Sequence, residues 1–207
     1  FQLQSNNSIV NSTYYLSTAS TLATTAQWEF YHQISFNPSS ANYTDVFLTA
    51  SASDLTATTT NGYFVRIGNT ADEIALYRKD GAVVTKIIDG VDGTLNTSNN
   101  IMKIKVVRNA ANQFTLNRDL TGTGNSYFTE GVVTDVTYTT SAFFGILIKQ
   151  STASFFQRHF FDDITVQVFV PDVTAPTLIS ATALTSSTLD VLFNEAVDLA
   201  TSQAMAN

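Results

Sequence analysis

The sequence contains no cysteine among its 207 residues. Neither a disulfide framework nor a thiolate metal site can therefore form. A module of about 170 residues buries roughly 70% of the surface that its unfolded chain exposes, so it can fold without crosslinks. The lack of cysteine accordingly does not argue against export from the cell.

Charged residues are also scarce, at 13% of the chain, and the 10 Lys and Arg are outnumbered by 17 Asp and Glu. Phosphate backbones require a basic face, so we expect no nucleic-acid partner. The longest apolar run, at 142–148 (AFFGILI), has the length of a strand. A bilayer span needs about 18 apolar residues, so we expect no membrane insertion. The start, FQLQSNNS, does not resemble a signal peptide. We expect that a leader has been removed and that the sequence begins inside a longer chain.

Helical periodicity is almost absent, whereas a period of two residues recurs along the chain. In 28–36 (WEFYHQISF), Trp28, Phe30, His32, Ile34 and Phe36 share one face, and polar residues alternate with them. Such alternation is typical of antiparallel strands with one buried and one solvated face. About ten strands at intervals of 8–12 residues predict an all-β sandwich. The further predicted strands are 45–50, 62–68, 73–78, 83–88, 101–108, 113–117, 141–149 and 159–170.

The end of the chain predicts a second module. The alternating strand that ends at Val170 is followed by a proline-punctuated connector, 171–176. A second strand pattern then begins at Thr177. We therefore predict a first domain at 1–170, a linker at 171–176 and a further β segment at 177–207.

Several motifs resemble those of known families. The first domain resembles a concanavalin/laminin-G-like jelly-roll module of large secreted bacterial surface proteins. The tail, at 172–198, resembles the start of the bacterial Ig-like domain of S-layer proteins. The motifs are YLSTAS (15–20), WEF (28–30), FNPSSANY (36–43), NGYFVRIG (61–68), LYRKDG (76–81), KIIDGVDGTLNTS (86–98), FDDITV (161–166), DVTAPTLISA (172–181) and LDVLFNEAVD (189–198).

The resemblance implies an antiparallel jelly-roll sandwich followed by the N-terminal part of an Ig-like domain. It also implies a bacterial cell-surface or secreted location and further domains in the same chain. It is a weak guide to function, because one fold hosts many activities.

A catalytic function finds little support in the sequence. Hydrolases with this fold use a strand of the type E-x-D-x-x-E, which places two carboxylates side by side. No such run occurs, and Glu29, Glu73, Glu130 and Glu195 stand without that spacing. A nucleophile elbow (G-x-S-x-G) is also absent. We expect no enzymatic activity, with a glycoside hydrolase of the same fold left open.

Asp162 and Asp163 are adjacent carboxylates in the last strand of the first domain. Strict alternation would bury one of them, and a buried carboxylate requires a partner or a metal. Calcium binds such oxygens, and the resemblance implies a structural calcium between this strand and an acidic N-terminal segment. No such segment is present in this sequence. The alternative is a β-bulge in which one Asp accepts backbone N–H groups.

Aromatic residues outside the core register suggest a sugar-binding face. Rings beside hydrogen-bonding groups suit pyranose sugars, and exposed apolar patches mark binding sites. The alternative is a second hydrophobic layer beneath a loop or a neighbouring domain. The candidate ligand-binding residues are Glu29, Tyr31, Gln33, Phe47, Phe64, Arg66 and Tyr77.

These observations predict a non-catalytic, glycan-binding or adhesive module of a secreted cell-surface protein. Its partner would be a polysaccharide or another surface protein. The alternative is a structural spacer or cargo module of a larger surface or secretion assembly, with no ligand of its own.

Overall fold

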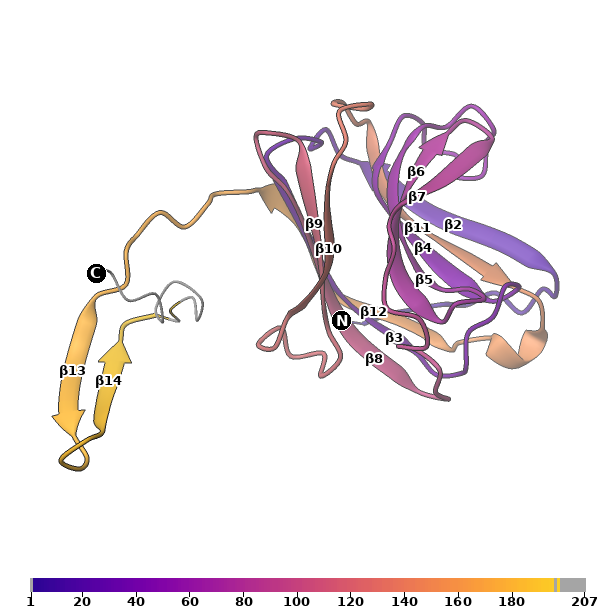
Figure 1. The fold of residues 1–207 in the computed structure, drawn as a ribbon. Helices are drawn as coiled ribbons and strands as arrows, with labels where there is room; N and C mark the ends of the chain where they lie inside the picture. Colours follow the sequence, from indigo (N-terminus) through magenta and orange to yellow (C-terminus); the bar gives the residue numbers. More distant parts are fainter. Residues whose placement is uncertain (1, 196, 198–207) are drawn as a thin grey trace. The chain divides into compact units, whose positions relative to one another are not determined.

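A computed structural model describes residues 2–195 and 197. The chain divides into two compact units, Phe1–Phe169 and Val170–Asn207 (Figure 1). In the described residues, the helical structure is a single short turn, η1 (Ala153–Phe155), and no helix has the length and hydropathy of a membrane span.

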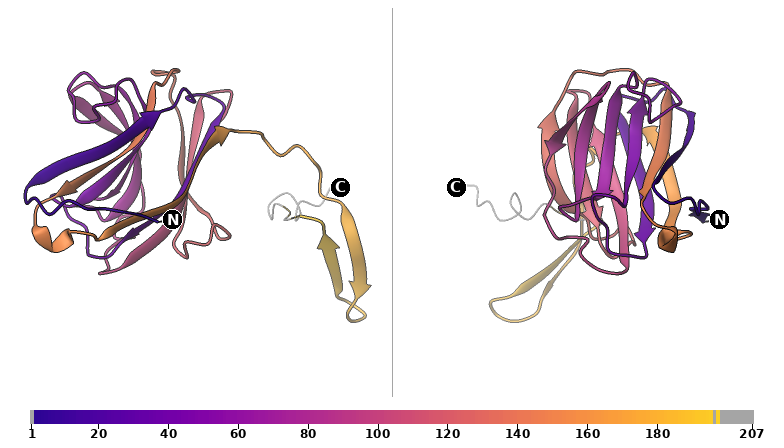
Figure 2. Two further views of the ribbon diagram at one scale, coloured as in Figure 1. Left: turned by 180° about the vertical axis from the view of Figure 1, so that it is seen from behind. Right: turned by 90° about the vertical axis from the view of Figure 1, so that its right-hand side faces the viewer.

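The first unit is a sandwich of two six-stranded antiparallel sheets (Figures 1 and 2). Sheet A has the order β1-β12-β3-β8-β9-β10, and sheet B has the order β2-β11-β4-β5-β6-β7. The strands of sheet A are β1 (Leu3–Gln4), β12 (His159–Val168), β3 (Ala26–Ile34), β8 (Asn100–Arg108), β9 (Gln113–Asp119) and β10 (Phe128–Thr134). Those of sheet B are β2 (Ser12–Ala19), β11 (Phe143–Gln150), β4 (Tyr43–Ala50), β5 (Gly62–Gly68), β6 (Glu73–Asp80) and β7 (Val83–Ile88).

The main core lies between the two sheets and follows the predicted alternation. The five residues predicted to share one face of the segment 28–36 are all buried. Tyr63, Val65 and Ile67 of β5 face them from sheet B. The predicted all-β, jelly-roll sandwich is therefore confirmed.

A second hydrophobic layer lies on the outer face of sheet B. Phe47, Phe64, Tyr77 and Leu147 form a cluster there, separate from the main core. Leu55, in the loop that joins β4 to β5, is 1% exposed and belongs to the same cluster. The loop thus covers part of this face.

Gly62 begins β5 immediately after this loop, at a φ of 152°. A Cβ at this position would lie 2.0 Å from the carbonyl oxygen of Thr49. The close approach of β4 and β5 at this point therefore requires glycine.

The second unit contains one antiparallel hairpin, β13 (Leu178–Ala183) and β14 (Leu189–Phe193). Two strands are marginal as an independent fold. The predicted Ig-like identity of this segment stays a prediction, and its residues 196 and 198–207 lie outside the described part of the chain.

Candidate functional site

The structure distributes the predicted ligand-binding residues over two separate faces. Glu29, Tyr31 and Gln33 lie on β3, on the outer face of sheet A. The other four lie on β4, β5 and β6 of sheet B, which the right-hand view of Figure 2 shows side by side. The single shared face that we expected is therefore not formed, because β3 and β4 follow each other in sequence but belong to opposite sheets.

Three aromatic residues form a row across sheet B. Phe47 is paired with Phe64 in the strand register, and Phe64 is paired with Tyr77. The ring centroids are 4.9 Å and 5.3 Å apart, and both pairs are stacked. Phe47 and Phe64 are at most 2% exposed and Tyr77 is 8% exposed. The row is thus a buried layer and not an open platform.

Arg66 extends this row with a charged group. Its Nε and Nη2 atoms donate to the two carboxylate oxygens of Asp45 at 2.7 and 2.8 Å. The guanidinium lies over the ring of Tyr43, 4.3 Å from its centroid, and 5.0 Å from the centroid of Tyr77. The bidentate contact with Asp45 fixes the side chains of Arg66 and Asp45 in one relative orientation.

These residues line a pocket of about 220 Å³ on the outer face of sheet B, which we call the Arg66 pocket. Tyr43, Asp45, Phe64 and Arg66 form part of its wall, and Thr56 of the covering loop forms another. Ligand pockets usually measure about 300–1,000 Å³, so this one can hold part of a ligand. It presents a carboxylate, a guanidinium and aromatic rings, which together bind vicinal hydroxyl groups well.

Burial influences the charges in the Arg66 pocket. Desolvation raises the pKa of Asp45 above its ordinary value, although the hydrogen bonds and charge of Arg66 oppose the rise. Desolvation likewise raises the pKa of the Tyr43 hydroxyl. The phenol of Tyr43 is therefore neutral at physiological pH and can both donate and accept a hydrogen bond.

Sequence reasoning did not single out Tyr43 or Asp45. Asp45 is buried and directly opposite Arg66 in the register of β4 and β5. The opposite charges on two successive predicted strands were a usable signal. To use this signal one must know the strand register, which the eleven-residue loop at 51–61 leaves open.

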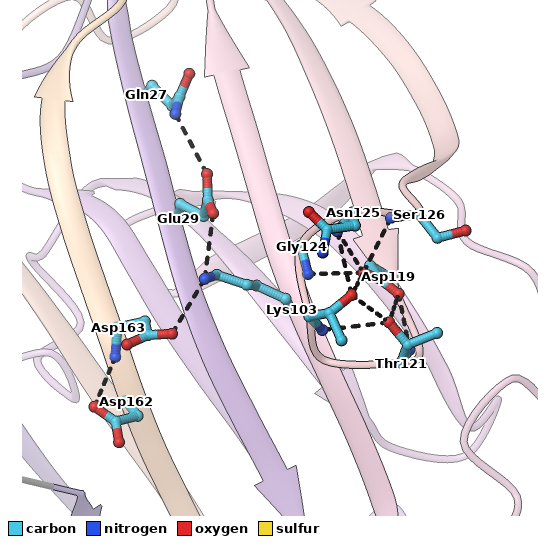
Figure 3. A network of polar contacts seen from close by, with 11 residues as sticks. Gln27, Glu29, Lys103, Asp119, Thr121, Gly124, Asn125, Ser126, Asp162 and Asp163 are labelled. Atoms are coloured by element: carbon cyan, nitrogen blue, oxygen red, sulfur yellow. Dashed lines mark hydrogen bonds and ion pairs between the residues drawn. The ribbon is translucent and has the colours of Figure 1, made fainter.

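The outer face of sheet A carries a chain of polar contacts (Figure 3). Lys103 donates to Asp163 at 3.1 Å and lies 3.6 Å from Glu29. Tyr31 donates to Gln33 at 3.3 Å. The three predicted residues on β3 are therefore engaged with their neighbours.

A loop after β9 folds onto the same face around Asp119 (Figure 3). The backbone N–H groups of Thr121, Gly124, Asn125 and Ser126 donate to its carboxylate at 2.8–3.2 Å. Burial would raise the pKa of Asp119, but the hydrogen bonds hold it well below its usual range. A Cβ on Gly122 would lie 3.0 Å from the ring of Tyr31, so this loop also covers part of Tyr31.

The structure buries neither carboxylate of the Asp162–Asp163 pair, contrary to the expectation from strict alternation. Asp163 has a φ of 50°, and the pairing of β12 with β3 shifts register between Asp162 and Thr165. The N–H of Asp163 donates to the carboxylate of Asp162 at 2.9 Å. This is the β-bulge alternative, and it keeps the Asp163 side chain 63% exposed.

These residues do not fit a calcium ion. The ammonium group of Lys103 already neutralises Asp163, and a calcium ion needs six to eight oxygen ligands. Within residues 2–195 and 197, no three His, Cys, Asp or Glu side chains are arranged to hold a metal.

The two histidines, far apart in sequence, meet in the main core. The rings of His32 and His159 are stacked, with centroids 5.8 Å apart, and both are fully buried. The hydroxyl of Thr44 lies between them, 3.1 Å from Nε2 of His32 and 3.0 Å from Nδ1 of His159. His32 is thus a core histidine with both ring nitrogens paired.

Known proteins resemble this chain in structure but not detectably in sequence. No protein-family model and no curated protein matches it. A carbohydrate-binding module (CBM66) from Bacillus subtilis is 12% identical, with a TM-score of 0.51 over 81% of this chain and 92% of its own.

The exoplasmic/lumenal domain of VIP36, solved with Ca²⁺ and Man3GlcNAc, is 10% identical, with a TM-score of 0.62 over 84% of this chain and 81% of its own. A legume lectin-like domain from Entamoeba histolytica is 10% identical, with a TM-score of 0.54 over 80% of this chain and 83% of its own. At such low identity these likenesses establish the fold alone: residues 2–169 form an antiparallel jelly-roll sandwich.

Proposed function

We propose that the sandwich is a non-catalytic glycan-binding module and that the sugar docks at the Arg66 pocket. The observation that carries the proposal is the Asp45–Arg66 pair, which is braced by aromatic rings and lines a pocket of about 220 Å³. The pair offers acceptors and donors a fixed distance apart, and Tyr43 adds an apolar ring. The similarity to carbohydrate-binding modules supports this assignment.

The acidic residues support a binding rather than a catalytic role. Glu73 lies 2.5 Å from Lys86, Glu130 is paired with Arg118, and Glu29 lies near Lys103. A carboxylate that is engaged in an ion pair within the fold is not free to contact a substrate. We therefore propose that the module binds sugar chains without cleaving them.

The wider context also belongs to the proposal. We infer a module of a secreted, cell-surface protein of bacterial origin, joined in series to Ig-like domains of the same chain. The resemblance of the motifs supports this context. Calcium is not part of the proposed binding chemistry, because the donor set at Asp162 and Asp163 does not fit it.

A structural spacer is the second candidate, and the buried aromatic row favours it. Phe47 and Phe64 are sealed beneath the loop that carries Leu55, so they cannot stack on a sugar. In this case the outer face of sheet B would serve stability alone.

A glycan array of plant, algal and bacterial polysaccharides tests the proposal. The sharpest variant is Asp45→Asn combined with Arg66→Gln, because it removes both charges and leaves neither one buried without its partner. We expect the wild-type protein to bind and the double variant to bind at least about tenfold more weakly, with a similar Tm. Tyr31→Ala, on sheet A, is the matched control and should bind like the wild type.

Two results would contradict the proposal in different ways. If Tyr31→Ala loses binding and the double variant keeps it, the sugar docks on sheet A. If the wild-type protein retains no polysaccharide, the spacer function is favoured. Release of reducing sugar would instead reveal a hydrolase.

A further inference from the structure

An apolar cleft opens between the two sheets at one edge of the sandwich. Strands β1 and β12 of sheet A form one wall, and β2 and β11 of sheet B form the other. The cleft has a volume of about 610 Å³. Its lining includes Leu16, Leu22, Phe144, Ile146, Ile164 and Val166, and among the described residues no charged side chain lines it.

Apolar side chains in the cleft and next to it are exposed, although their positions face inward. Val166 is paired with Trp28 and Val168 with Ala26, so both point to the inner side of sheet A. Nevertheless, Val168 is 57% exposed, and Leu16 on the facing sheet is 60% exposed. Inner-face residues of the central strands, such as Trp28 and Ile104, are buried. Exposed apolar surface of this kind marks a binding site.

Among the described residues, the backbone at this edge has no partner along the last part of β12. β1 pairs with β12 only at Leu3–Phe161 and Gln4–Phe160, whereas β12 continues to Val168. Beyond β12, the N–H of Phe169 donates to the carbonyl of Thr25, next to β3. In an antiparallel pair of strands, the backbone groups of successive residues point alternately toward the partner strand and away from it. Since the N–H of Phe169 points toward β3, the N–H and C=O groups of Val166 and Val168 point away from β3, toward the open edge.

We propose that a partner polypeptide adds a strand to this edge, antiparallel to β12 and in line with β1. Its backbone pairs with Val166 and Val168, and its alternate apolar side chains fill the cleft. β1 already begins this arrangement, because Leu3 pairs with β12 and lines the cleft. In strand addition, main-chain hydrogen bonds supply affinity and pockets for alternate side chains supply specificity. An alkyl chain would fill the cleft but would leave the free backbone groups unpaired.

The probe for the test is a fluorescein-labelled peptide of alternating valine and threonine with a lysine at each end. We expect it to raise the fluorescence anisotropy on binding to the full chain and to slow hydrogen exchange at the amides of Val166 and Val168. The same peptide with N-methyl groups on alternate amides keeps its apolar side chains but cannot form the ladder. It should bind at least about tenfold more weakly.

Two variants locate the site. Leu16→Asp places a charge on the wall of the cleft, at an exposed position that tolerates it, and should reduce peptide binding by at least about tenfold. Val132→Lys, at an equally exposed position on the opposite edge strand β10, is the matched control and should not change it.

Three results would overturn the proposal. The alternating peptide could fail to bind, the N-methylated peptide could bind as well as its parent, or dodecanoate could displace the peptide without any exchange protection at Val166 and Val168. The last two outcomes would indicate a site for apolar ligands and not for a strand. All of these readouts are independent of glycan binding.

Discussion

At the scale of single residues, Thr44 determines the protonation of the two core histidines. The Nδ1 of His32 lies 3.0 Å from the carbonyl of Phe160, which can only accept, so this nitrogen carries the proton. Nε2 of His32 then accepts from the Thr44 hydroxyl, whose oxygen accepts from Nδ1–H of His159. These contacts fix the tautomer of each ring, and burial keeps both rings neutral. Among the described residues, Nε2 of His159 has no partner.

This arrangement makes the protein sensitive to mild acid. Burial lowers the pKa of His32 to about 4 and holds the pKa of His159 well below its usual range. The unfolded chain therefore binds protons first, near pH 6.5, and stability falls as the pH drops from there toward 4. At about 1.4 kcal/mol per pH unit, His32 alone accounts for a loss of about 3 kcal/mol.

Urea denaturation at several pH values between 7.5 and 4 measures this loss. The variant in which His32→Phe and His159→Phe are combined should show a much flatter dependence above pH 5. Equal slopes for the wild type and this variant would refute the role of the histidines.

At the scale of elements, the loop after β9 depends on one carboxylate. Asp119 accepts four backbone N–H groups from residues 121–126, which have no other strand or helix to pair with. Asp119→Asn replaces an acceptor oxygen with a donor group that faces these N–H groups. We expect the free energy of unfolding to decrease by about 2 kcal/mol.

Equilibrium urea denaturation at neutral pH checks this expectation. Asp92→Asn is the matched control, because Asp92 is exposed in a turn, and it should leave the free energy unchanged. An Asp119→Asn protein as stable as the wild type would contradict the anchoring role.

Some properties of the strands could be predicted from the sequence and others could not. Alternation placed Trp28 and Phe30 inside correctly, because a half-buried strand imposes a period of two. It could not tell that Tyr31 and Phe64 belong to different sheets, because the period says nothing about strand partners. The sequence allows a bulge at Asp163 as one of two alternatives, but the positive φ of this residue depends on tertiary pairing and not on the local pattern.

The strands that the alternation did not identify lie near the edges of the sheets. β2 is an edge strand of sheet B and β10 of sheet A, and both have irregular burial patterns. An edge strand packs against fewer neighbours, so its sequence is less constrained. Arg108, at the end of a predicted strand, is fully buried and donates to the carbonyls of Ala23, Tyr138 and Asp135, a partnership that no local pattern signals.

At the scale of the whole molecule, we predict that the sandwich does not depend on calcium for its stability. Lys103 supplies the positive charge beside Asp163 and Glu29 that a metal would otherwise provide. The Tm should therefore be the same in millimolar EDTA and in millimolar calcium chloride. A Tm that falls in EDTA and recovers when calcium is added would show that a metal site exists.

The topology of the sandwich also affects how the protein is made. Leu3 pairs with Phe161, and Ala26 pairs with Val168, so β1 and β3 pair with β12, the last strand of the sandwich. Contacts between such distant positions slow folding, because a long stretch must be ordered before they form. During synthesis, sheet A stays incomplete until β12 has left the ribosome. We expect nascent chains up to that point to expose β3 and its aromatic residues, which makes them prone to aggregation until β12 pairs with β3.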